Sequence, residues 1–201
     1  MFGPKFAQRV AEEINKARTE PETYAKKISD SIQYFYKNLL RLPHESGIET
    51  QEGPKAYQEA AEFLSKAQKL PALKIEPKLT EAAQEIAKEM GKFKEMDEMD
   101  GVDREAIIKK YGYYKGKMRE STDFGSVKPE LVVCSLLVDD GNESRSNREL
   151  IFNPEFTVVG TACQPHDDLG AINLIIFASN FTEGEEPPMQ PEVVTVEEEK
   201  K

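Results

Sequence analysis

Apolar residues recur every three or four positions through the first two thirds of the chain, a spacing that predicts amphipathic helices. The clearest stripe is formed by Phe6, Val10, Ile14 and Ala17. The same spacing predicts further helices over residues 21–39, 54–70, 79–90, 105–111 and 129–139. Prolines open three of these segments, where their fixed φ suits the first helical turn. Thr80 is the predicted N-cap of the helix that begins at residue 79.

The last third of the chain changes to strand-like patterning. Residues 158–163 and 172–178 are rich in β-branched and apolar side chains, which favours two strands. The polar residues 164–170 between them predict a turn, so that the two strands form a hairpin. Helices early in the chain and strands late indicate an α+β fold rather than alternating strand–helix units.

Composition favours a single domain with a modest core. The chain has 201 residues, of which 38% are hydrophobic and 32% are charged. Its 27 basic and 37 acidic residues give a net charge of 27 − 37 = −10, so we expect no nucleic-acid partner. Because the chain has no run of about 18 apolar residues, we also expect no transmembrane segment.

The N-terminus and the cysteines favour a reducing compartment. Residues 1–10 lack the apolar stretch of a secretory signal. Cys134 and Cys163 are the only cysteines, too few for a disulfide framework in a chain of this length. We expect both thiols to be free and to pack as small apolar groups. The sequence therefore predicts a cytoplasmic or otherwise intracellular protein.

Negative charge collects at the end of the chain. Residues 183–201 hold seven Glu, two Lys and three Pro, a net charge of 2 − 7 = −5. This composition is typical of a solvated segment that cannot bury a core. We therefore predict a folded domain over residues 1–182 and an acidic tail, rich in Pro and Glu, over residues 183–201.

Four segments share their order and spacing with one known family. Residues 10–18 read VAEEINKAR, and residues 70–83 read LPALKIEPKLTEAA. Residues 136–156 read LLVDDGNESRSNRELIFNPEF, and VGTACQPH follows at 159–166. Together they resemble the CAP superfamily, or SCP domain, which includes cysteine-rich secretory proteins, antigen-5 and class-one pathogenesis-related proteins. The resemblance implies a three-layer α–β–α sandwich with a small antiparallel sheet, and it makes about residues 21–69 a helical insertion.

Many CAP proteins gather two histidines and two acidic residues in a central cleft that can hold zinc. The resemblance places the two histidine positions on Met96 and Asn147, so both histidines are absent. It places the acidic positions on Glu120 and on Asp139, with Asp140 as the alternative to Asp139. These four cleft positions are the candidate site that the family implies.

The substitutions at the cleft positions argue against zinc. Methionine and asparagine do not suit zinc beside carboxylates, so we expect no metal and no cofactor. Glu120 and Asp139 alone would form at most a weak calcium or magnesium site, and otherwise they act as structural hydrogen-bond acceptors. The chain's two histidines lie elsewhere: His44 is expected on a surface loop, and His166 in a structural hydrogen bond at the hairpin.

Loss of both cleft histidines favours a non-enzymatic protein. The leading hypothesis is an interaction or structural module in an intracellular assembly, with protein partners and with the cytoskeleton or cilium as one setting. The insertion supplies extra surface for such a partner. Two alternatives stay open: a lipid- or sterol-binding CAP protein, and a weak metal-dependent hydrolase that uses Glu120 and Asp139.

Overall fold

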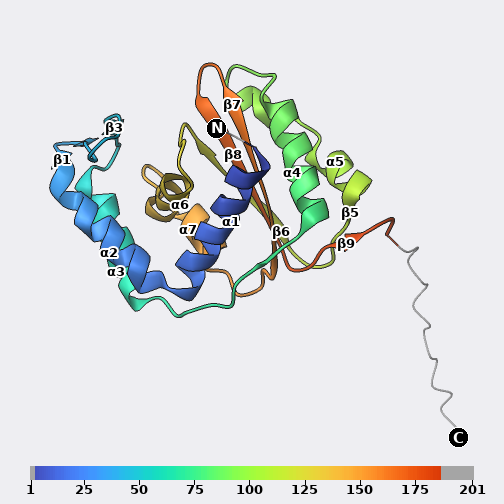
Figure 1. The fold of residues 1–201 in the computed structure, drawn as a ribbon, viewed down its shortest axis with the longest axis horizontal. Helices are drawn as coiled ribbons and strands as arrows, with labels where there is room; N and C mark the ends of the chain where they lie inside the picture. The colour runs from blue at the N-terminus through green and yellow to red at the C-terminus, as the bar shows by residue number, and fades with distance from the viewer. Residues whose placement is uncertain (1–2, 187–201) are drawn as a thin grey trace, which may run out of the picture.

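A four-stranded sheet forms the centre of the computed structural model, which describes residues 3–186 (Figure 1). Its strands run in the order β4–β7–β8–β6. Their bounds are Lys74–Ile75 for β4, Met118–Phe124 for β6, Val158–His166 for β7 and Gly170–Ala178 for β8. The predicted hairpin is β7–β8, and β6 pairs with β8 in antiparallel register. Only the two-residue β4 departs from the expected antiparallel sheet, because it runs parallel to β7.

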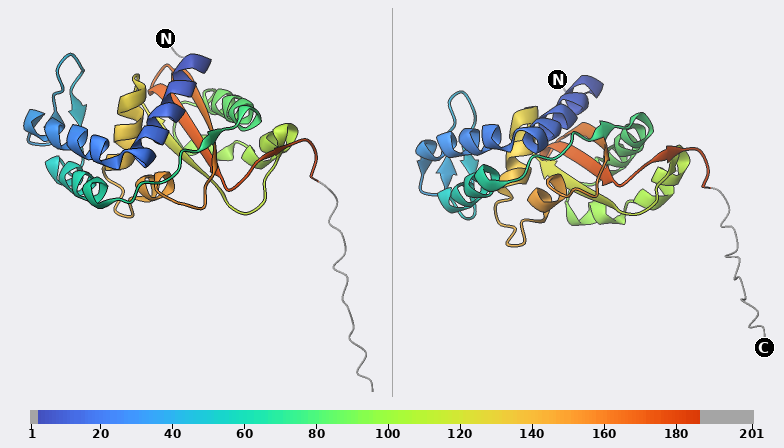
Figure 2. Two further views of the ribbon diagram at one scale, coloured as in Figure 1. Left: turned by 60° about the horizontal axis from the view of Figure 1, so that its bottom comes forward. Right: turned by 90° about the horizontal axis from the view of Figure 1, so that it is seen from below.

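Helices cover both faces of this sheet and confirm the α–β–α sandwich (Figure 2). One face packs against α1 (Pro4–Thr19), α6 (Pro129–Val138) and α7 (Ser146–Ile151). The other packs against α4 (Pro77–Met90) and α5 (Arg104–Tyr111), joined by the short η2 (Asp97–Gly101). Neighbouring residues of β8 divide between the two cores, since Ile175 faces the α1 side and Ile176 the α4 side.

Close approach of α4 to the sheet depends on one glycine of β7. A Cβ on Gly160 would lie 2.5 Å from the backbone carbon of Leu79 in α4. Any larger residue would push the helix from the strand, because real Cβ atoms do not approach backbone so closely. Gly160 therefore fixes how tightly this layer packs.

Proline sets the start of most helices, as the sequence suggested. It occupies the first turn of α1, α2, α3, α4 and α6. Pro77 starts α4 two residues before the predicted position, so Thr80 lies inside the helix and the prediction that it is the N-cap is wrong. The third predicted helix is also shorter than expected, because α3 (Pro54–Lys66) ends four residues before Leu70.

The insertion at residues 21–69 is only partly helical. After α2 (Pro21–Ser31), the chain forms η1 (Ile32–Tyr34) and a small sheet of β1 (Phe35–Tyr36), β2 (Leu39–Leu40) and β3 (Ile48–Glu49) before α3 begins. The prediction of one helix through residue 39 is therefore wrong. Its apolar residues beyond Ser31 are aromatic or branched and favour extended structure. Figure 1 shows this small sheet, which we call the β1–β3 hairpin, at one end of the molecule.

The far end of the molecule carries a second small sheet. β5 (Gly112–Tyr113) pairs with β9 (Thr182–Glu183) in antiparallel register. The predicted boundary between residues 182 and 183 falls within β9. Most of the predicted acidic tail, residues 187–201, lies outside the described residues.

Candidate functional site

Asp139 and Asn147 lie together in a part-buried hydrogen-bond network. Asp139 Oδ1 accepts a bond of 2.8 Å from the side-chain amide of Asn147, and Oδ2 accepts one of 2.8 Å from its backbone N–H. The amide of Asn142 donates a third bond to Oδ2 at 3.1 Å. Only 6% of Asp139 is exposed. Its carboxylate therefore holds the start of α7, through Asn147, and the loop before it, through Asn142.

The backbone explains why this aspartate reaches α7. Asp139 caps the C-terminal end of α6 in the left-handed conformation, with φ of 54°, which turns the chain back toward the sheet. Aspartate tolerates this conformation better than most residues because its short side chain bonds locally. On the other side of the network, the Ser121 hydroxyl of β6 donates to Asn147 Oδ1 at 2.5 Å. Asn147 thus links the α6–α7 corner to the sheet.

Glu120 lies on the opposite face of the sheet from its neighbour Ser121, as alternation along a strand requires. Its carboxylate forms an ion pair of 2.5 Å with the guanidinium of Arg104 at the start of α5. Burial raises the pKa of Glu120 above its usual value, and the charge of Arg104 opposes that rise. Arg104 also donates to the carbonyls of Met99 and Val102, so the pair fastens η2 and α5 to the sheet.

Met96 stands just before η2 and is 53% exposed. The structure therefore joins two of the four family cleft positions, Asp139 and Asn147, in direct contact. Glu120 faces α5 instead, and Met96 faces solvent. The β6 residue whose side chain reaches Asn147 is Ser121, which the resemblance did not single out.

A second polar group follows on the same face as Asn147. Asp123 of β6 is 4% exposed and accepts bonds from the Asn173 amide at 2.9 Å and the Ser126 hydroxyl at 3.0 Å. Burial raises its pKa to about 6, although these bonds act in the opposite direction. Cys163 lies next to Asn173 across the β7–β8 pair, and burial raises the pKa of its thiol to about 12. This thiol is buried and unactivated, as expected from the sequence.

Two arginines of the α6–α7 corner hold the insertion. Arg145 pairs with Glu52 at 2.6 Å and with Glu59 at 2.8 Å, and Arg148 pairs with Glu59 at 2.9 Å. Asp140 adds bonds from the backbone N–H groups of residues 51 and 52. The sequence analysis did not predict this cluster, because Arg145 precedes α7 in the left-handed conformation and only Arg148 lies on the helix. It ties α3 to the segment that carries Asp139.

Both histidines of the chain have positions that exclude them from this network. His44 is exposed on the loop after β2. His166 ends β7, where Nε2 meets the Phe93 carbonyl at 2.7 Å and Nδ1 accepts the backbone N–H of Leu169 at 3.0 Å. Accepting at Nδ1 places the ring proton on Nε2. The expected structural hydrogen bond of His166 is confirmed.

The cleft residues do not fit the zinc site implied by the family. Asp139 has both oxygens occupied by amide donors, and Glu120 is paired with Arg104 on the other face. Within residues 3–186, no group of three or more His, Cys, Asp or Glu side chains could hold a metal ion. Zinc needs ligands that converge on one point, and this arrangement does not supply them.

The three layers, the β7–β8 hairpin and the α6–α7 corner together define a CAP-type domain. A family model described as "CAP: Cysteine-rich secretory protein family" matches residues 11–181, and the chain belongs to this family. No curated protein matches the chain. None of the helices in the described part combines the length and apolar character needed to cross a membrane.

Two solved structures are similar to this chain. One is an outer surface protein from Borrelia burgdorferi, with 25% identity and a TM-score of 0.44 over 65% of this chain and 95% of that one. The other is a cysteine-rich secretory protein from Staphylococcus aureus, with 16% identity and a TM-score of 0.41 over 77% of this chain and 48% of that one.

Proposed function

We propose that this CAP domain is a non-enzymatic interaction or structural module in an intracellular assembly. The observation that carries the proposal is the internal use of the cleft residues. Asp139 accepts three bonds from the N–H groups of Asn147 and Asn142, and Glu120 is paired with Arg104. A general base needs a free lone pair within reach of a substrate proton, and these two carboxylates are engaged elsewhere.

The histidines support the same reading. The cleft of many CAP proteins contains two histidines. In this chain His166 forms hydrogen bonds at the β7–β8 turn, and His44 lies on the loop of the insertion. The free thiols support an intracellular setting, because both cysteines are unpaired. A cytoskeletal or ciliary assembly is one setting of this kind.

The two alternatives have less support. A hydrolase that uses Glu120 and Asp139 would need both carboxylates on one side of the sheet. A lipid or sterol carrier would need a largely apolar cavity. The two described hollows, at the β1–β3 hairpin and beside β5, have charged side chains on their walls.

Metal titration separates the module from the hydrolase. We expect calorimetric titration of the full chain with zinc, calcium or magnesium to show no stoichiometric binding. The matched variant is Asp139→Asn, which removes the carboxylate charge beside Asn147 and keeps one acceptor oxygen. Binding of one ion per wild-type chain that a folded Asp139→Asn variant loses would overturn the proposal in favour of the hydrolase.

Native mass spectrometry of the protein taken gently from its own cells tests the assembly directly. We expect the 22.7 kDa chain in complexes of defined composition that include a protein partner. A bare monomer would contradict the module, and a monomer that carries a lipid or sterol would favour the carrier.

A further inference from the structure

The tip of the insertion presents an exposed aromatic ring between two cations. Tyr36 is 63% exposed. The ammonium of Lys37 lies 5.9 Å from its ring centroid, and the guanidinium carbon of Arg41 lies 5.7 Å from it. Within residues 3–186, neither cation forms an ion pair with a carboxylate. We call these three residues the Tyr36 knob.

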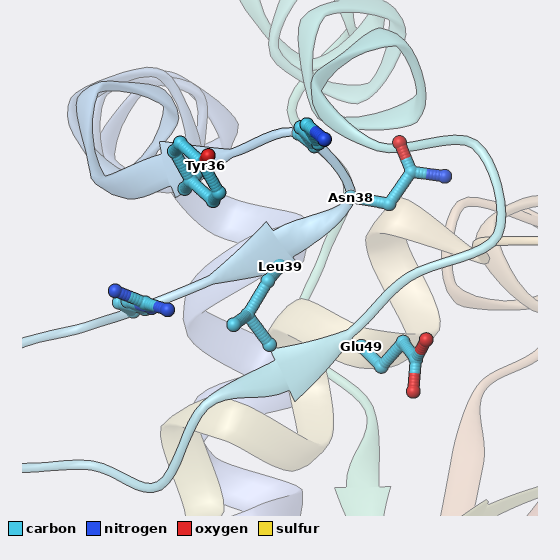
Figure 3. Close-up of a pocket in the computed structure, with 6 residues that line it drawn as sticks. Tyr36, Asn38, Leu39 and Glu49 are labelled. Atoms are coloured by element: carbon cyan, nitrogen blue, oxygen red, sulfur yellow. The ribbon is translucent and has the colours of Figure 1, made fainter.

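The knob is held in place by its own backbone. Arg41 N–H donates to the Tyr34 carbonyl at 3.0 Å, and Thr50 N–H donates to the Asn38 carbonyl at 2.8 Å. Tyr36 and Leu39 lie on neighbouring strands (Figure 3). Both line a pocket of about 640 Å³. A fixed loop loses little conformational entropy when it binds, so the knob is prepared for a partner.

A second hollow has the complementary character. It measures about 430 Å³ and lies between α5 and β5, where Ile108, Tyr113 and Tyr114 line it. The carboxylates of Glu105, Glu185 and Glu186 and the ammonium of Lys109 also line it, so its walls keep a net negative charge. Lys109 pairs with Glu105 at 2.6 Å, and the charge of Glu186 also acts on Lys109. Glu185 and Glu186 form no close ion pair in the described part of the chain. We call this hollow the β5 pocket.

The β1–β3 segment that carries the knob and the α5–β5 segment that lines the pocket lie at opposite ends of the ribbon in Figure 1. We propose that the Tyr36 knob of one copy docks into the β5 pocket of a second copy. The Tyr36 ring would meet the Tyr113 and Tyr114 rings, an arrangement that aromatic pairs favour. Lys37 and Arg41 would meet Glu185 and Glu186, so a positive end would face a pocket of net negative charge.

The proposed contact joins two different surfaces, so it is head-to-tail. Each pairing leaves a free knob at one end and a free pocket at the other, and repetition builds an open chain of copies. This inference rests on the proposed role as an assembly module and names its partner surface. It would make the insertion the connecting element of the assembly.

Two single-end variants and their mixture test the proposal. We expect sedimentation velocity of the full chain to show larger species as concentration rises. Arg41→Glu should disable the knob, and Glu186→Lys the pocket, each weakening self-association by about tenfold or more. An equimolar mixture should regain association, because the intact knob of one variant meets the intact pocket of the other.

Matched controls alter charge by the same amount elsewhere. Lys94→Glu and Glu143→Lys change exposed side chains outside both surfaces, and we expect both to associate like the wild type. Circular dichroism verifies folding, and Tyr36→Ala and Glu185→Lys serve as second variants for the two ends.

A wild-type monomer at every concentration, a mixture that stays monomeric, or controls that dissociate equally would overturn the proposal. None of these results alters the metal titration or the complex with a different protein, so the proposed function is judged separately.

Discussion

Asn147 binds Asp139 twice, through its backbone N–H to one carboxylate oxygen and through its side-chain amide to the other. Asn147 stands where the family resemblance expects a histidine, and it makes a structural link between α6 and α7 there. Through Ser121 it also links this corner to the sheet.

Asp139→Ala should therefore destabilise the domain strongly. It leaves the two N–H groups of Asn147 without their acceptors and puts alanine at a left-handed backbone position, for a loss of about 2–4 kcal/mol. Asp139→Asn keeps one acceptor and tolerates that backbone, so it should cost less. Urea unfolding measures both, with the exposed neighbour Glu143→Ala as control. Equal stability of Asp139→Ala and the control would contradict the network.

The clamp between Glu52 and Arg145 should weaken in acid. The hydrogen-bonded Arg145 lowers the pKa of Glu52 from the usual 4.5 to about 2. The stabilisation is therefore complete above pH 4.5 and is lost as the pH falls through about 2. Glu52→Gln should lower the melting temperature at pH 7, and its difference from the wild type should shrink toward pH 2. Glu62→Gln, which breaks an exposed helix pair with Lys66, is the control and should change little. A Glu52→Gln deficit that stays constant with pH would contradict this assignment.

Asp123 should have the opposite pH dependence. Its pKa rises on folding from 3.8 to about 6, so the folded state holds a proton that the unfolded state releases. Its contribution is complete below pH 3.8 and is lost as the pH rises through about 6, on the order of 3 kcal/mol in all. The stability of Asp123→Asn relative to the wild type should therefore increase from pH 4 to pH 7.5. A difference that does not vary over this range would mean that Asp123 titrates normally.

Arg18 should be sensitive even to a conservative change. Its buried guanidinium donates to the carbonyls of Pro71, Ile151 and Asn153, and burial lowers its pKa to about 10. An ammonium cannot reproduce the planar fork that serves several acceptors, so Arg18→Lys should cost about 2–4 kcal/mol in urea unfolding. Lys16→Met, on the exposed side of the same helix, should be close to neutral. An unchanged free energy of unfolding for Arg18→Lys would show that the carbonyls of Pro71, Ile151 and Asn153 do not need the guanidinium as their donor.

Local pattern was enough to predict the helices that bury a single stripe and the β7–β8 hairpin. It did not predict β6. In this strand Glu120 faces Arg104 on one side of the sheet. Ser121 and Asp123 are buried among polar partners on the other side. The alternation there is between two kinds of polar residue, so no hydrophobic period marks the strand. It also failed in the insertion, where Tyr36 and Leu39 pair across a two-residue turn that helical spacing does not reveal.

The candidate site was predictable only in part. Asp139 and Asn147 lie eight positions apart in one recognisable segment, and the structure joins them. Which way Glu120 points depends on the pairing of β6 with β8, and sequence spacing does not determine this pairing. The contact between Glu52 and Arg145 spans 93 positions, so only the assembled fold brings these two residues together.

The position of β8 has a consequence for the order of assembly. This strand lies between β7 and β6, yet residues 170–178 are among the last of the domain to leave the ribosome. Until they emerge, β6 has no partner strand, and the apolar faces of α1 and α4 have no complete sheet to cover. Pairing of strands far apart in the sequence slows folding, and it leaves apolar surface of the nascent chain exposed until β8 is available. We therefore expect this domain to fold after its synthesis is finished rather than during it.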